Sequence, residues 1–279
     1  PGESVNDPTP PLASFLPMAV RGRRVVGRAA DSAMAEWIET CAERIHDGDV
    51  FNVLKQTDRR LVFRDGEHVV KVVFLGSLRR KRKWRRYGRK EAKNLTHAAS
   101  LGLNVPGVLA QGRLRRWCDP LVASVLLIEH MTGRSSLASQ LATAGDHDTR
   151  RRELDRVSGL LVELVRTGCF HVDVGPDNVF LPSHGSRVIG PAVIDLEYAE
   201  FVAPGQVTQL VLQSARLARY CRQDWPELDY SRWFDGVLES ARAVCAIDLS
   251  TGEMMRREFR RQLEISSIRR ESTGLIQAA

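Results

Sequence analysis

The chain has 279 residues, of which 43% are hydrophobic and 27% charged, a composition that excludes a disordered or fibrous protein. This length allows one large domain or two smaller ones, with an apolar core that needs neither a metal nor a disulfide for stability. Five cysteines lie far apart without a CxxC pair, which argues against a zinc site and a disulfide framework and favours a reducing compartment.

Positive charge is concentrated in one segment of the chain. The formal net charge is +7, and residues 79–90 contain nine basic residues and no acidic one. Without these nine, the 41 basic residues fall to 32, against 34 acidic residues, so the rest of the chain is nearly balanced. Such a run is usually a solvated loop, but with Trp84 and Tyr87 it also fits a nucleic-acid surface or an anionic membrane surface.

The first 24 residues contain five prolines and no periodicity, which predicts a disordered or loosely docked arm. No apolar run approaches the roughly 20 residues that span a bilayer. In a signal peptide the basic residues come before the apolar segment, whereas here they follow the short SFLPMAV segment. We therefore expect a cytoplasmic protein.

The segment from Asp31 to Phe74 begins with a helical pattern and continues with strands. Apolar residues at helical spacing predict a helix from Asp31 that ends before Gly48. The segments 50–55, 60–64 and 68–74 are rich in β-branched and aromatic residues, and Asp65-Gly66 between the last two indicates a hairpin turn.

After the basic run, the chain returns to a helix and then to two strands. Ala92, Leu95, Ala99 and Leu103 form one apolar stripe, which predicts a helix that ends near Gly102. Strands are expected at residues 107–114 and 121–131, before Gly133 interrupts the pattern.

The remaining segments are mostly helical. A helix with apolar residues from Leu154 to Val165 is expected to run to Gly168. Residues 178–181 and 191–197 suggest a short hairpin. Three helices are expected after it, near 206–223, 229–246 and 252–270. A β-rich part followed by a helix-rich part predicts an α+β chain with two lobes. The expected parts are an N-terminal arm and helix (1–44), a small β-rich lobe (45–131) and a larger helical lobe (132–279).

Polar residues in apolar surroundings are the strongest functional signal. The five residues of this kind are Lys71, Glu91, Asp173, Asn178 and Asp195. A buried charge is costly unless it is paired or bound to a ligand, so these residues call for a common explanation. Phosphoryl transfer offers one, because it needs a lysine for phosphates, oxygen ligands for magnesium and a carboxylate for the acceptor proton.

Four motifs carry a resemblance to kinases. HVDVGPDN (171–178) is similar to the kinase catalytic loop, VIDLE (193–197) to the D-F-G motif, VVKVV (69–73) to the V-A-I-K motif and LLIEHMTG (126–133) to the hinge between kinase lobes. The likeness covers about residues 50–200. Within the protein-kinase-like superfamily, the chain most resembles the lipopolysaccharide core kinases that act on Kdo and heptose. In that group, as here, a basic stretch after the strand lysine leads into the helix glutamate.

This resemblance implies a two-lobed protein-kinase-like fold, with ATP and Mg²⁺ as cofactors. It implies that Asp173 is the catalytic base and that Asn178 and Asp195 bind magnesium. Lys71, paired with Glu91, would bind the nucleotide phosphates. The backbones of Glu129 and Met131 would receive adenine. His171 would brace the catalytic loop rather than react.

Plain structural roles are also open for these residues. Asp and Asn after Gly-Pro suit a turn, Lys71 can extend from an edge strand to solvent, and Glu91 suits the first turn of a helix.

The pattern departs from regulated protein kinases in three places. No glycine-rich loop precedes the strand lysine. Residues 56–60 (QTDRR) stand there instead, and the guanidinium groups of Arg59 and Arg60 are candidates for the phosphate contacts. Gly175 stands where protein kinases usually have lysine, and Val172 replaces an arginine. A helical pattern begins soon after Asp195 without an A-P-E motif, which leaves no room for docking a peptide and favours a small molecule or glycan as acceptor.

We therefore predict an ATP- and Mg²⁺-dependent kinase of lipopolysaccharide biosynthesis that phosphorylates a sugar hydroxyl of the inner core. Residues 79–90 would contact an acidic glycolipid or the anionic inner membrane, and nucleic acid is the less favoured partner. Two alternatives stay open. One is a small-molecule kinase of the aminoglycoside or choline type, and the other is a catalytically silent kinase-like binding module.

Overall fold

The computed structural model describes residues 19–21, 25–47, 52–57, 59–77, 81–82, 88–116 and 119–277. They form two compact units, the first ending at Thr132 and the second beginning at Gly133. The first unit is built on an antiparallel sheet and the second is mainly helical, so the α+β prediction is confirmed. No helix among the described residues combines the length and the apolar character needed to cross a bilayer.

The first unit contains an antiparallel sheet that has seven strands within the described residues. Its order is β1-β2-β6-β7-β5-β4-β3, and the bounds are β1 (Ala19–Arg21), β2 (Val25–Ala29), β3 (Val53–Gln56), β4 (Arg60–Asp65), β5 (His68–Phe74), β6 (Val108–Arg116) and β7 (Asp119–Glu129). The β4–β5 hairpin turns at Gly66, whose φ of 58° lies in the left-handed region that glycine adopts without strain.

The expectation of an unstructured arm through residue 24 is wrong for Ala19–Arg21. These three residues pair antiparallel with β2, which in turn pairs with β6, and so they form one edge of the sheet. Sequence periodicity missed them because three residues are too few to show an alternating pattern. The rest of the predicted arm lies outside the described residues.

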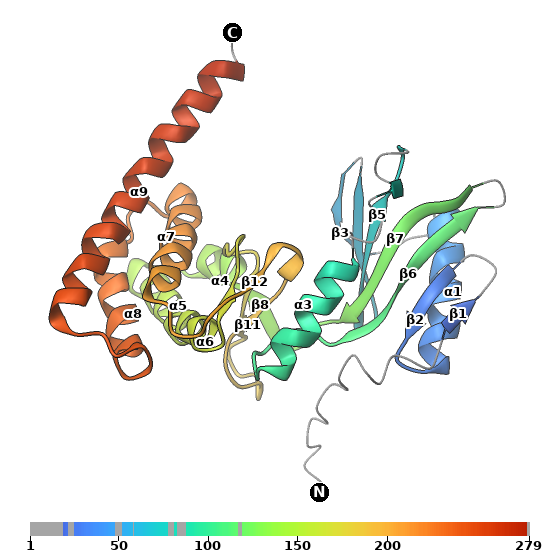
Figure 1. The fold of residues 1–279 in the computed structure, drawn as a ribbon, viewed down its shortest axis with the longest axis horizontal. Helices are drawn as coiled ribbons and strands as arrows, with labels where there is room; N and C mark the ends of the chain where they lie inside the picture. The colour runs from blue at the N-terminus through green and yellow to red at the C-terminus, as the bar shows by residue number, and fades with distance from the viewer. Residues whose placement is uncertain are drawn as a thin grey trace, which may run out of the picture. The chain divides into compact units, whose positions relative to one another are not determined.

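The two faces of this sheet are covered by different helices. Helix α1 (Ser32–Asp47) buries Ile38 and Cys41 against alternate strand residues such as Val70 and Val72. Residue Lys71 lies between these two valines, so its side chain points to the opposite face. Helix α3 (Arg89–Ser100) covers that face, and Figure 1 shows α1 and α3 on either side of the strands.

The second unit contains six α-helices within the described residues. They are α4 (Leu137–Thr143), α5 (His147–Asp155), α6 (Ser158–Arg166), α7 (Val207–Asp224), α8 (Tyr230–Cys245) and α9 (Leu249–Gln277). The single helix expected to run to Gly168 is instead two, because α5 ends at Asp155 and α6 begins at Ser158. An apolar stripe continues across the short break, so the periodicity alone did not reveal it.

Short strands hold the loops of the second unit in place. The predicted hairpin is confirmed, since β10 (Val179–Pro182) pairs antiparallel with β11 (Ala192–Val193) and also with β8 (Arg134–Ser136). A second small sheet pairs β9 (Cys169–Phe170) with β12 (Glu200–Phe201). These two sheets fix both ends of residues 171–178, the segment between β9 and β10.

Aromatic side chains of α8 join this helix to α9 and α5. Phe234 of α8 stacks on Phe259 of α9 with ring centroids 4.1 Å apart and planes 3° from parallel. The indole N–H of Trp233 donates to the carbonyl oxygen of Leu154 at 3.0 Å, which ties α8 to α5. In Figure 1, α9 lies alongside α7 and α8.

Candidate active site

Lys71 and Glu91 of the first unit form a largely buried ion pair. Lys71 Nζ lies 2.5 Å from Glu91 Oε1, and the side chains are 16% and 5% exposed. The strand alternation of β5 directs Lys71 toward α3, and Glu91 lies in the first turn of that helix. Since both charges are largely removed from water, each depends on the other for its stability.

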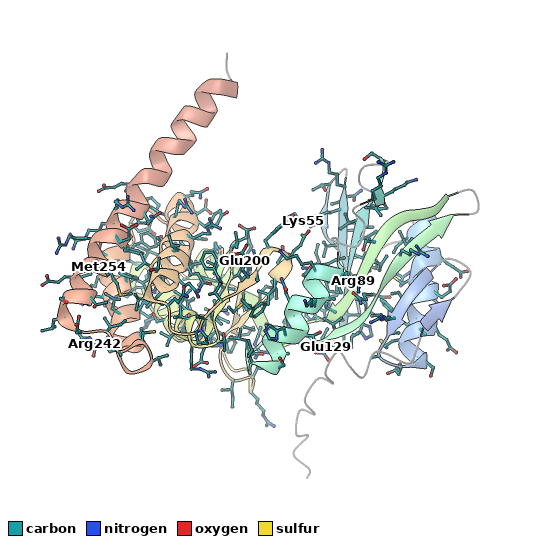
Figure 2. The ribbon with its side chains drawn as sticks, in the orientation of Figure 1. Lys55, Arg89, Glu129, Glu200, Arg242 and Met254 are labelled. Carbon is teal, nitrogen blue, oxygen red and sulfur yellow. The ribbon has the colours of Figure 1, made fainter. Side chains whose placement is uncertain are left out.

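Gly88 allows the start of α3 to approach the sheet. This residue has a φ of 67°, and a Cβ placed on it would lie 3.1 Å from Ser124 Oγ and 3.6 Å from Leu126 Cβ. Leu126 is the cross-strand partner of Lys71 on β7. The glycine therefore positions the first turn of α3, and with it Glu91, above Lys71. Figure 2 shows Arg89 at the beginning of this helix.

The end of β7 has an unusual pairing with Gly107. The N–H of Glu129 donates to the carbonyl oxygen of Gly107 at 2.9 Å, while the N–H of Gly107 donates to the side-chain Oε2 of Glu129 at 3.0 Å. A Cβ on Gly107 would lie 2.5 Å from that same oxygen, so a side chain here would displace the carboxylate. Because its own N–H is already bonded, the main chain of Glu129 can offer only its carbonyl oxygen to a ligand. Glu129 is labelled in Figure 2.

Met131 follows two residues later in the segment that leaves β7. The N–H of His130 donates to the carbonyl oxygen of Glu67 at 2.8 Å, which extends the pairing with β5 by one bond. Met131 is half-buried and lies just before the boundary of the first unit.

The turn between β3 and β4 is closed by a threonine rather than by glycines. Thr57 Oγ1 accepts the N–H groups of Arg59 at 3.2 Å and of Arg60 at 3.0 Å. The N–H of Thr57 donates to the carbonyl oxygen of Arg60 at 2.8 Å. A glycine-rich loop binds phosphate through free N–H groups, but here two of them are taken by Thr57. The N–H groups of Thr57, Arg59 and Arg60 are thus all bonded within the turn, and the exposed side chain of Arg59 is the described group that could reach phosphate.

In the second unit, residues 171–178 separate apolar from polar side chains. Val174 and, at the start of β10, Val179 are fully buried, whereas Asp173 and Asp177 are exposed. The apolar residues hold the loop against the core, and the carboxylates face solvent. This arrangement explains why polar side chains are interspersed in such an apolar stretch.

His171 links the two polar motifs of the second unit. Its Nδ1 accepts the N–H of Asp173 at 3.2 Å, so the ring proton lies on Nε2, which donates to the carbonyl oxygen of Ile194 at 2.9 Å. Burial lowers the pKa of His171, against the opposing effects of the Ile194 carbonyl and the nearby carboxylates. The imidazole is therefore neutral and acts as a brace between the loop and the residue before Asp195.

Backbone hydrogen bonds connect Asn178 with Asp173 and with the residue before Asp195. Asn178 Nδ2 donates to the carbonyl oxygen of Asp173 at 2.8 Å, which leaves its amide oxygen directed elsewhere. The N–H of Ile194 donates to the carbonyl oxygen of Asn178 at 3.0 Å, so Asp195 follows the strand that pairs with this residue. Asp195 itself has φ 59° and ψ 53°, a left-handed conformation that is uncommon outside glycine and is frequent at functional sites.

Tyr220 is a neighbour of Asp173 that the sequence did not reveal. Its hydroxyl donates to Asp173 Oδ1 at 3.0 Å, from the second-last turn of α7 and 47 residues further along the chain. Burial raises the pKa of Tyr220, and the hydrogen bond and charge of Asp173 raise it further. No motif marks this tyrosine, so only the three-dimensional structure identifies it.

The basic run is described only in part. Residues 78–80 and 83–87 lie outside the described residues, so the expectation for Trp84 and Tyr87 cannot be compared with the structure. Arg82, Arg89 and Lys90 have exposed side chains.

A sheet unit with a lysine–glutamate pair, followed by a helical unit with an Asp-x4-Asn loop, defines a phosphotransferase of the protein-kinase-like class. The model of the lipopolysaccharide kinase (Kdo/WaaP) family matches residues 56–236, more than half of the chain. The chain belongs to this family. The predictions of a kinase and of the lipopolysaccharide kinase group are therefore confirmed.

Solved structures of two kinds are also similar to the chain. The structure of WaaP in complex with acyl carrier protein has a TM-score of 0.48 and 17% identity, and the match covers 76% of this chain and 88% of that one. A co-crystal structure of WbdD with a kinase inhibitor has a TM-score of 0.46 and 21% identity, covering 75% of this chain and 44% of that one. No curated protein sequence matches the chain significantly.

Proposed function

We propose that the protein transfers the γ-phosphoryl group of ATP, in the presence of Mg²⁺, to a sugar hydroxyl of a lipopolysaccharide inner core. Family membership supports the kinase activity and the class of substrate. The observation that carries the proposal is the fixation of Asp173, whose main chain is bonded to both His171 and Asn178 while its carboxylate faces solvent.

In this proposal, Asp173 is the catalytic base. The acceptor hydroxyl donates its proton to the carboxylate as its oxygen attacks the γ-phosphorus. His171 does not exchange a proton, because both of its nitrogens are engaged and burial lowers its pKa. It holds Asp173 and the segment before Asp195 in a fixed position relative to each other.

Asn178 and Asp195 are the proposed magnesium ligands. Magnesium prefers oxygen donors and is usually held by one or two protein carboxylates or amides together with substrate phosphates. The amide of Asn178 fits this requirement, because its nitrogen is bonded to Asp173 and only its oxygen remains to bind a cation. When bound, the ion would neutralise charge on the β- and γ-phosphates.

The first unit would bind the nucleotide. Lys71 supplies positive charge for the phosphates and Glu91 holds it in place. Adenine would donate its amino group to the carbonyl oxygen of Glu129 and receive the N–H of Met131, since the N–H of Glu129 is bonded to Gly107. Arg59 and Arg60 would add guanidinium contacts from the turn closed by Thr57.

Positive charge near Asp173 favours an acidic acceptor over an aminoglycoside. Arg216 and Arg219 of α7 lie close enough to Tyr220 to lower its pKa, and Arg216 acts on His171 in the same way. A cationic acceptor would be repelled by these side chains, whereas a carboxylated or phosphorylated sugar would be attracted. ATP is a cytoplasmic substrate, so we place the reaction on the cytoplasmic side of the inner membrane, with residues 79–90 as a peripheral contact for anionic lipid.

A catalytically silent nucleotide-binding module is the second candidate. The observation that favours it is the turn at Thr57, where two N–H groups that a glycine-rich loop would offer to phosphate are already bonded. Such a module would bind Mg-ATP without turning it over.

The test is phosphoryl transfer from labelled ATP to a panel of lipopolysaccharide core fragments, aminoglycosides and a generic protein substrate. We expect label on a core fragment, and we expect Asp173→Ala to reduce turnover by about a hundredfold or more while Mg-ATP still raises the melting temperature. Asp177→Ala is the matched control, because this aspartate is exposed in the same loop. Unchanged turnover in Asp173→Ala would refute the assignment. A thermal shift without transfer to any acceptor would favour the silent module.

A further inference from the structure

Helix α7 contacts residues 171–175 of the catalytic loop at three points. The N–H of His171 donates to Oε1 of the buried Gln213 at 2.9 Å. Two turns later, the hydroxyl of Tyr220 donates to Asp173 Oδ1 at 3.0 Å. The third point is Gly175, against which the Tyr220 ring packs. This helix therefore contacts the first part of the loop, although no sequence motif assigns it a function.

Gly175 provides the surface on which the tyrosine ring rests. A Cβ placed on this glycine would lie 3.3 Å from Tyr220 Cδ2 and 3.7 Å from Cε2, tighter than ordinary van der Waals contact for the nearer atom. The ring thus lies directly over the loop backbone, two residues beyond Asp173. A side chain at position 175 would have to displace the ring, and the hydroxyl would move with it.

The hydroxyl of Tyr220 is a hydrogen-bond donor at neutral pH. Burial and the neighbouring Asp173 carboxylate raise the pKa of the phenol, whereas Arg216 and Arg219 lower it to a smaller extent. The phenol therefore keeps its proton. Among the described residues, only Tyr220 donates a hydrogen bond to the Asp173 carboxylate, and it binds Oδ1 of a side chain that is otherwise exposed.

We propose that Tyr220 is a positioning residue for the catalytic base. By holding Oδ1 of Asp173, it directs Oδ2 toward the acceptor hydroxyl. This inference rests on the proposed function of Asp173. In the step it serves, the acceptor oxygen forms a bond to the γ-phosphorus and its proton passes to Oδ2. The bond from the γ-phosphorus to the bridging oxygen breaks, its electron pair leaves with ADP, and Tyr220 keeps its own proton.

The first test compares Tyr220→Phe with Tyr230→Phe. Both substitutions remove one hydroxyl, but the hydroxyl of Tyr230 donates to the carbonyl oxygen of Trp225 within the helical core. With labelled ATP, Mg²⁺ and a Kdo-containing core fragment as acceptor, we expect Tyr220→Phe to lower kcat by about tenfold to a hundredfold and to leave KM for ATP within twofold. Tyr230→Phe should lower the melting temperature and leave kcat within twofold. An unchanged or increased kcat in a folded Tyr220→Phe protein overturns the proposal.

The second test uses Gly175→Ala alone and combined with Tyr220→Phe. If the glycine acts through the tyrosine, Gly175→Ala lowers kcat in the wild-type background but has little further effect when the hydroxyl is already absent. Equal losses in the two backgrounds overturn the coupling. Circular dichroism and thermal unfolding of each variant establish that it is folded.

Asp173→Ala separates the two levels of the argument. If this variant loses turnover while Tyr220→Phe keeps it, the positioning role fails and the proposed function stands. If Asp173→Ala keeps turnover, Asp173 is not the base and the inference for Tyr220 fails with the proposed function.

Discussion

Lys71 Nζ and Glu91 Oε1 lie 2.5 Å apart, although a strand, a basic run and a helix turn separate the two residues in the chain. The pair is largely buried, so each charge is stabilised by the other. In the proposed function, this pair gives the nucleotide phosphates a lysine that is held in one position.

Removal of one charge of this pair should be more costly than removal of both. We expect Glu91→Gln to lower the free energy of unfolding by about 3 kcal/mol, because Lys71 is left buried without its partner. The double variant Lys71→Met, Glu91→Gln should recover most of that loss and still fail to transfer phosphate. Urea unfolding measures the stability. Asp235→Asn breaks the exposed Arg256–Asp235 pair as a control and should cost less than about 1 kcal/mol.

The turn at Thr57 should influence nucleotide affinity through its arginines. We expect Arg59→Gln to weaken Mg-ATP binding by about threefold to tenfold at low salt and by less at high salt, because a partly exposed charge is screened. Thr57→Val should weaken it similarly, since the N–H groups of Arg59 and Arg60 lose their acceptor. Isothermal titration calorimetry provides the affinities. Arg64→Gln, near the other end of β4, should leave them unchanged, and an equal loss there would argue for a general charge effect.

A side chain at position 107 should displace the Glu129 carboxylate. We expect Gly107→Ala to cost about 1 kcal/mol of stability, since the new Cβ would lie 2.5 Å from Glu129 Oε2 and would break its hydrogen bond with the Gly107 N–H. Glu129→Ala in the same protein should recover part of the loss. Gly236→Ala is a control in helix α8, where a Cβ meets nothing within 4 Å, and it should be neutral or stabilising. Equal costs at both glycines would show that the close contact is not responsible.

His171 should make stability depend on pH. Burial lowers the pKa of its imidazole in the folded state below the usual value of 6.5, so between these two pKa values the unfolded chain binds more protons than the folded one. The stabilising contribution is complete above about pH 6.5 and is lost as the pH falls through the folded pKa. The groups that face the ring are Asp173, Asp195 and Arg216. Urea unfolding at several pH values should show a flatter dependence in His171→Gln, and an identical slope would contradict a buried neutral histidine.

Much of the fold followed from local sequence patterns. The strand 68–74 was predicted with the bounds that the structure shows, because four β-branched valines flank Lys71 and the Asp65-Gly66 turn precedes them. The edge strand Ala19–Arg21 and the break after Asp155 were missed, because each depends on contacts with distant segments rather than on a local repeat. Asp173 and Asn178 were singled out from the sequence because their spacing is itself the signal.

The sequence by itself determined the type and order of the chemical groups: a strand lysine, a helix glutamate, an aspartate and an asparagine five positions apart, and an aspartate after a strand. Only the tertiary structure decided which groups touch. The hydroxyl of Tyr220 on Asp173 Oδ1, the N–H groups bonded to Thr57 and the proton on Nε2 of His171 depend on distances of a few ångströms between separately folded elements. Hydrogen bonds require such distances and angles, and a linear pattern of residue types does not specify them.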